Sequence, residues 1–141
     1  LKAVKDELES VVLVTTKNPN SFKGAPFFDN SNINPDKISE PTVLFDGKAK
    51  EAVSLFPKNV NVAALLSLVG LGSENTSVRV VADPNTNKNT HQINANGKFG
   101  NLSFTIENIP DSTNPKTSRL AILSAIELLR QICTKEVQIG T

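Results

Sequence analysis

Residues 77–106 read SVRVVADPNTNKNTHQINANGKFGNLSFTI, and this stretch contains three short strand-like runs separated by turn residues. Residues 77–82 are rich in β-branched side chains and predict a strand, and an asparagine-rich turn follows. Residues 91–96 alternate between polar and apolar side chains, which predicts a second strand. Residues 97–101 then predict a hairpin turn into a third strand. Consecutive strands of this kind indicate a sheet that is largely antiparallel.

The remainder of the chain adds further strands and several helices. Expected strands cover residues 10–16 and 42–46, and expected helices cover the end of segment 1–9, residues 47–56, residues 62–71 and the stretch that begins at 114–115. The helix at 62–71 is apolar nearly all round, so we expect it to be buried, with Asn59 or Asn61 as its cap. This order predicts an α+β domain, in which a mixed, largely antiparallel sheet has helices packed on one face.

Alternation also predicts which side chains face the core. Ile93 and Ala95 should point inward from their strand. The inward face of the returning strand should consist of Leu102, Phe104 and Ile106. The last helix should bury a stripe made of Leu120, Leu123, Ile126, Leu129, Ile132 and Cys133. Residues 17–40 are too rich in asparagine and proline for a long regular element, and a loop of that length is often functional or mobile.

Composition narrows the class of protein. The chain has 141 residues, 38% hydrophobic and 21% charged, which is typical of one globular domain. A net charge of +1 gives no basic surface for a nucleic acid, and the apolar run at 60–71 is too short to span a membrane. Cys133 has no second cysteine to pair with, so we expect a reducing compartment, the cytoplasm.

Two absences concern cofactors and metals. The sequence contains neither a Gly-x-Gly-x-x-Gly turn nor a Walker-type loop, so it has no nucleotide-phosphate cradle of its own. One histidine without a cluster of carboxylates falls short of a metal ligand set, and we expect no metal. The chain also lacks methionine and starts in what resembles the tail of a helix. We therefore expect it to be one part of a longer protein.

His91 is the single histidine, and it is the first candidate for acid–base chemistry. Its unperturbed pKa allows it to take and give a proton near neutral pH. It lies where the asparagine-rich turn enters a strand, on the same side as Ile93 and Ala95. A polar group there is either hydrogen-bonded packing or the rim of a cleft, and the pattern leaves both open.

Polar side chains recur at helix starts and strand ends, where backbone N–H groups and short side chains can meet a ligand. They lie in segments 56–64 (FPKNVNVAA), 81–84 (VADP) with 89–91 (NTH), 107–110 (ENIP) and 114–118 (NPKTS). As a set, together with 23–26 (KGAP), 44–47 (LFDG) and 50–52 (KEA), they resemble the C-terminal domain of the L-aspartate dehydrogenase family. The resemblance runs from Val11 to about Ile132.

The resemblance implies a two-domain enzyme in which residues 1–141 form a single C-terminal catalytic and dimerisation domain. An N-terminal dinucleotide-binding domain, absent from this chain, would hold most of the NAD or NADP. The implied reaction oxidises L-aspartate to iminoaspartate, which hydrolyses to oxaloacetate and ammonia or feeds NAD biosynthesis. The implied assembly is a homodimer, with no nucleic acid or membrane as partner.

The resemblance also implies roles for single residues. His91 matches the active-site histidine, and Asn61 matches the asparagine that contacts the nicotinamide end of the dinucleotide. A substrate with two carboxylates needs cationic or N–H-rich groups, and Lys116, Thr117 and Ser118 at a helix start meet that need. Lys58 is a weaker candidate, because it also suits a solvated helix entrance.

Two other interpretations remain open from the sequence. One is the substrate and dimerisation domain of a different NAD(P)-dependent enzyme, similar to homoserine dehydrogenase or dihydrodipicolinate reductase. The other is a non-catalytic oligomerisation module that kept the fold without the cofactor domain.

Overall fold

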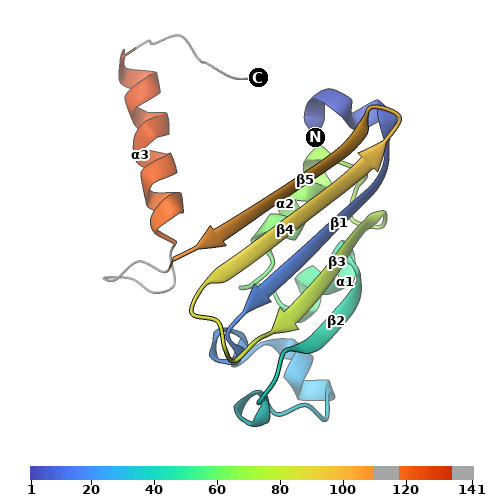
Figure 1. The fold of residues 1–141 in the computed structure, drawn as a ribbon, viewed down its shortest axis with the longest axis vertical. Helices are drawn as coiled ribbons and strands as arrows, with labels where there is room; N and C mark the ends of the chain where they lie inside the picture. The colour runs from blue at the N-terminus through green and yellow to red at the C-terminus, as the bar shows by residue number, and fades with distance from the viewer. Residues whose placement is uncertain (110–117, 135–141) are drawn as a thin grey trace. The chain divides into compact units, whose positions relative to one another are not determined.

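The computed structural model describes residues 1–109 and 118–134, which belong to two compact units. The first unit, Leu1–Glu107, holds the sheet and the two helices that cover it (Figure 1). The second unit starts at Asn108 and holds helix α3, Arg119–Thr134. No helix in the described residues is both long enough and apolar enough to cross a membrane.

One five-stranded sheet forms the framework of the first unit, with the strand order β2-β3-β1-β4-β5. The strands are β1 (Leu8–Lys17), β2 (Thr42–Lys48), β3 (Thr76–Ala82), β4 (Asn89–Gly97) and β5 (Gly100–Asn108). β1 runs parallel to β3 and antiparallel to β4, and β2 runs antiparallel to β3. The sheet is therefore mixed and mostly antiparallel, which confirms the predicted fold class.

The central strand β1 has one strongly buried face. Val11, Leu13 and Thr15 alternate along it and are at most 1% exposed. Leu13 lies opposite Val78 on one side and Ile93 on the other, so each neighbouring strand contributes to the same apolar layer. This register fixes which side chains of β4 face inward, because a slip of one residue would turn them all to the other face.

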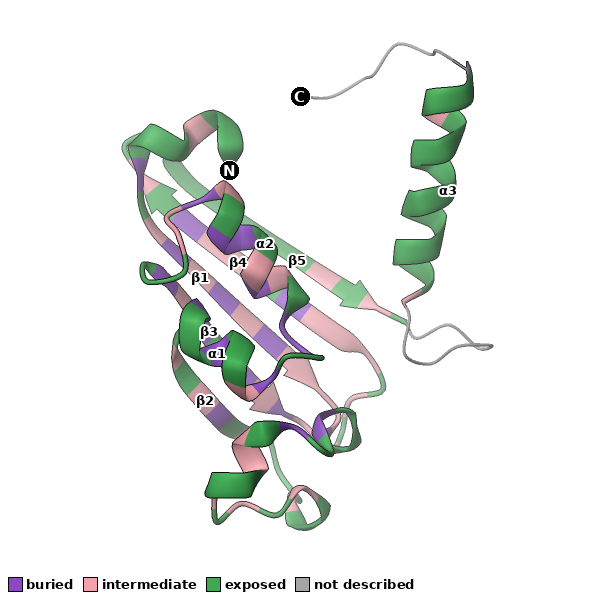
Figure 2. Cartoon of the chain, turned by 180° about the vertical axis from the view of Figure 1, so that it is seen from behind, coloured by how far each residue is buried: buried purple, intermediate pink, exposed green. Residues whose placement is uncertain are grey.

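Helices α1 (Ala49–Leu55) and α2 (Asn61–Val69) cover this buried face, as Figure 2 shows. Ala63 and Leu66 of α2 point into the core, but Leu65 and Leu68 are 60% and 79% exposed. The expectation that this helix is buried all round is therefore wrong. α2 is the outer layer of a two-layer unit, so only one of its sides meets the sheet.

Four short 3-10 helices complete the first unit. The first, η1 (Lys2–Glu7), precedes β1, where the sequence predicts the end of a helix. The other three lie in the long loop between β1 and β2: η2 (Pro19–Phe22), η3 (Pro26–Asn30) and η4 (Pro35–Lys37). The side chains of Asn18 and Asn34 cap η2 and η4. Phe22 is fully buried with its ring edge-on to Phe56 at 5.9 Å, so the loop is anchored in the core.

The hairpin forms where predicted, but the returning strand is less buried than expected. Gly100 has a φ of +113°, a conformation that favours glycine in this turn. Leu102 and Phe104 of β5 are 45% and 53% exposed, which corrects their assignment to the core. The helices contact β2 and β3. β5 lies three strands from β3, roughly 14 Å away at the usual strand spacing, and is therefore beyond this cover.

The last helix also differs from the prediction. α3 is described from Arg119, and its predicted start at residues 114–115 falls within residues 110–117, which lie outside the described part of the chain. Its apolar residues Leu120, Leu123, Ile126, Leu129 and Ile132 are exposed, as is Cys133. Among the described residues of this unit, the expected burial of the stripe is therefore not found.

We predict that Leu13→Ala lowers the free energy of unfolding of the 141-residue chain by about 2–5 kcal/mol, because it leaves a cavity at the centre of the sheet. Leu68→Ala is the matched control: the same atoms are removed from a side chain that is 79% exposed, and we expect a change within about 0.5 kcal/mol. Urea denaturation followed by circular dichroism measures both. Equal effects of the two substitutions would contradict the described core.

Candidate active site

The candidate site begins where the end of β1 meets the start of β4. Thr15 lies directly opposite His91 in the antiparallel register. Both side chains are on the inward face: Thr15 is fully buried and His91 is 7% exposed. Thr15 Oγ1 lies 3.1 Å from His91 Nδ1, within hydrogen-bond distance. When Nδ1–H donates to this hydroxyl, Nε2 is left as the proton acceptor.

Burial sets the charge of the imidazole. Burial, followed by the nearby positive charge of Lys17, lowers the pKa of His91 from 6.5 to about 4. An imidazole with this pKa is neutral at pH 7. His91 therefore has the protonation state that a general base requires.

Lys17 is a functional candidate that the sequence interpretation missed. It is the last residue of β1, two positions after Thr15, and so shares the inward face. Its Nζ donates to the backbone carbonyl of Asn59 at 3.1 Å. Burial lowers the pKa of this ammonium group. The feature of the sequence that could have identified Lys17 is the alternation of β1, which places it on the same apolar face as Leu13 and Thr15.

The asparagine-rich turn is fastened to the end of β1. The Asp83 N–H donates to the Lys17 carbonyl at 2.9 Å. The Asn18 side-chain amide donates to the carbonyls of Thr86 at 3.2 Å and Pro84 at 3.4 Å. These long-range bonds hold the turn that precedes His91, so the imidazole is positioned by both its strand and its loop.

Asn61 is the first residue of α2 and is exposed. Neither Asn59 nor Asn61 caps the helix, which corrects the prediction: Val60 holds the cap position and no side chain makes a capping hydrogen bond. Asn59 instead donates its amide to the Ser21 carbonyl at 2.7 Å. Because Lys17 also binds Asn59, these contacts join the His91 end of the sheet to the start of α2.

The structure describes some of the residues that were expected to hold the substrate carboxylates, and others lie outside its described part. Lys116 and Thr117 lie outside the described residues. Ser118 is described, and its hydroxyl accepts the Ala121 N–H at 3.1 Å, which is an N-cap interaction with α3. Lys58 is exposed and lines a cavity of about 200 Å³ beside Asn59. The structure thus brings together His91, Thr15, Lys17 and the loop before Asn61.

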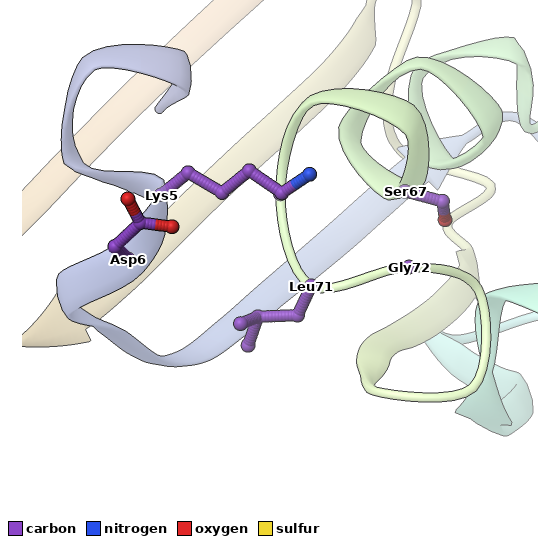
Figure 3. Close-up of a pocket in the computed structure, with 6 residues that line it drawn as sticks. Lys5, Asp6, Ser67, Leu71 and Gly72 are labelled. Atoms are coloured by element: carbon purple, nitrogen blue, oxygen red, sulfur yellow. The ribbon is translucent and has the colours of Figure 1, made fainter.

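A second hollow, of about 400 Å³, lies at the opposite end of β1 (Figure 3). Lys5 and Asp6 of η1 face Leu71 and Gly72 across it. These residues precede β1 or follow α2. Thr15 lies seven residues after the first residue of β1, which is a distance of roughly 23 Å along the strand at the usual rise. The hollow is therefore separate from the His91 site.

The side chains that commonly bind metals are dispersed in the part of the chain that the structure describes. Across 1–109 and 118–134, histidine, cysteine, aspartate and glutamate side chains form no group of three that could hold a metal ion. The chemistry of the site rests on its hydroxyl, imidazole, ammonium and amide groups. Asn61 offers an exposed amide at a helix start, and an amide donor and acceptor pair matches the carboxamide of a nicotinamide ring.

Comparisons with known proteins agree on one family. The model of the family described as aspartate dehydrogenase, C-terminal, matches residues 1–132. L-aspartate dehydrogenase from Nitrosopumilus maritimus is 67% identical over the whole chain, which covers 52% of that protein. L-aspartate dehydrogenase from Bradyrhizobium diazoefficiens is 46% identical over 92% of the chain, and the match covers 46% of that protein.

A solved structure gives the same result. The crystal structure of aspartate dehydrogenase from Thermotoga maritima matches with a TM-score of 0.70 and 29% identity, over 100% of this chain and 50% of that chain. The chain therefore spans about half the length of these relatives. With the family model matching 132 of its 141 residues, the chain belongs to the aspartate dehydrogenase family and corresponds to its C-terminal domain.

Proposed function

We propose that the chain is the substrate-binding and catalytic domain of a cytoplasmic L-aspartate dehydrogenase that contributes to NAD biosynthesis. The observation that carries the proposal is the neutral, oriented imidazole of His91 in a chain of this family. The relatives are about twice as long, which supports a partner domain for the dinucleotide in the same protein. Residues 1–141 would then act as a single domain beside it.

His91 would handle the protons of the reaction. The amino group of L-aspartate must be neutral before the α-carbon can release a hydride. His91 Nε2 can accept that proton while Nδ1–H stays bonded to Thr15. Once the ring has released the proton to solvent, the neutral imidazole can take a proton from the water that attacks iminoaspartate. The NAD or NADP supplies the hydride acceptor when bound. This chain contributes orientation, through Asn61 at the start of α2, and proton transfer.

We predict that the full-length protein reduces NAD or NADP with L-aspartate, whereas the 141-residue chain alone has no activity. His91→Ala in the full-length protein should lower turnover by about two to four orders of magnitude, as expected for loss of a general base. Absorbance of the reduced nucleotide follows the reaction. Gln92→Ala is the control, because this neighbouring side chain is exposed on the other face of β4. Near-normal turnover in the His91 variant contradicts the assignment.

We predict that the imidazole of His91 titrates near pH 4 in the 141-residue chain, where one histidine gives one set of imidazole NMR signals. The unfolded chain has a histidine pKa of about 6.5. Protons therefore bind the unfolded state first as the pH falls from 6.5 to 4, and stability decreases across that window. Since one pKa unit is worth 1.36 kcal/mol, the loss approaches about 3 kcal/mol. His91→Gln should lack this component, and a midpoint at or above 6.5 contradicts the described burial.

We also propose a homodimer, supported by the exposed apolar side chains of β5 and α3. Sedimentation of the 141-residue chain should give the dimer mass, and Phe104→Glu should shift the chain toward monomer, because a charge on the apolar face of β5 opposes its burial. Ser103→Glu is the control on the opposite face of the same strand. A monomeric wild-type chain, or equal effects of the two variants, argues against this interface.

A further inference from the structure

We propose that Lys17 binds a carboxylate of the four-carbon substrate next to His91, which makes it a residue that determines substrate specificity. This inference rests on the proposed function, since it places the substrate at the His91 end of the sheet. The alternation of β1 puts the Lys17 side chain on the same face as Thr15, two residues along the strand. Thr15 in turn lies opposite His91 and within 3.1 Å of its ring.

The surroundings of Lys17 are unusual for a lysine. Its Nζ has a neutral carbonyl, that of Asn59, as its hydrogen-bond partner at 3.1 Å. Among the described residues Lys17 takes part in no ion pair, whereas Lys23, Lys50 and Lys88 each pair with a carboxylate at the surface. A partly buried cation without a counter-charge carries a desolvation cost. A carboxylate of the ligand would remove that cost by supplying the missing charge.

Two other charged groups near the site have partners of their own. On the turn before His91, the Asp83 carboxylate accepts the Asn85 N–H at 2.9 Å. Lys88 pairs with Glu107 at 2.5 Å. Lys17 also lowers the pKa of the His91 imidazole through its charge, so the two groups share one electrostatic environment. A carboxylate bound at Lys17 would place the amino-bearing carbon of the same small molecule close to the imidazole.

A cavity lies beside Asn59, whose carbonyl is the hydrogen-bond partner of Lys17. It has a volume of about 200 Å³, and Asn59, Ser21 and Lys58 are among its lining residues. Asn59 is fixed by three contacts, to Lys17, to Ser21 and to the Phe56 carbonyl. These contacts hold in place the backbone carbonyl that Lys17 binds.

The test uses the full-length protein with Lys17→Met, which removes the charge but keeps the apolar stem. Loss of a charge-assisted hydrogen bond of about 1.5–3 kcal/mol corresponds to a roughly 10- to 150-fold rise in the KM for L-aspartate. The KM for the nucleotide and the melting temperature should stay unchanged. Lys17→Arg should recover part of the affinity for L-aspartate. Lys50→Met is the control, because Lys50 is an exposed lysine on α1, and it should leave every constant unchanged.

A binding measurement separates this inference from the proposed function. Calorimetry with succinate, a four-carbon dicarboxylate without an amino group, should show weaker binding to Lys17→Met by the same factor. If the wild-type protein does not turn over aspartate but binds succinate in a way that depends on Lys17, the proposed function is wrong and the carboxylate site at Lys17 is supported. Normal turnover with an unchanged aspartate KM in Lys17→Met overturns the inference and leaves the enzyme intact. If Lys17→Met raises the KM values for L-aspartate and for the nucleotide equally and lowers the melting temperature, Lys17 has a structural role, and this result also overturns the inference.

Discussion

The pairing of β1 with two neighbours of opposite direction is the constraint on which the site depends. β1 runs parallel to β3 and antiparallel to β4. The antiparallel pairing places the end of β1 beside the start of β4, at one end of these strands. The hydroxyl of Thr15, the ammonium of Lys17 and the imidazole of His91 are gathered there from segments far apart in the sequence. The register that buries Leu13 also turns these three polar groups inward, so packing and site geometry are set by the same contacts.

Placing polar groups on an apolar face has a desolvation cost in free energy, and local hydrogen bonds offset part of that cost. Thr15 and His91 satisfy each other, and Lys17 has the Asn59 carbonyl. Asn18 and Asp83 bond the loop to the end of β1, so the strand end cannot open without losing several interactions at once. The depressed pKa of His91 is a direct result of this burial, and it provides the neutral form that a base needs at pH 7.

The sequence predicted the strands and the inward face of β4 because β-branched runs and alternation depend on local chemistry. It missed Lys17 because the first strand was expected to end at residue 16, one residue early, which assigned the lysine to the loop. Alternation found the apolar face of Leu102 and Phe104 but could not indicate what covers it. The role of Asn59 was missed for a related reason, since its bond to Ser21 joins segments whose proximity only the tertiary fold creates.

The charges at the sheet edge suggest how binding and catalysis depend on each other in this proposal. Without substrate, burial and, after it, the positive charge of Lys17 lower the pKa of His91, which keeps the imidazole neutral but makes it a weak base. A carboxylate at Lys17 cancels that positive charge and adds a negative charge near the ring, and both effects raise the pKa of His91 toward neutrality. The base would therefore gain strength where a dianionic substrate is bound. A monocarboxylate that left Lys17 unpaired would lose binding energy and would also meet a weaker base, so specificity and proton transfer would have a common origin.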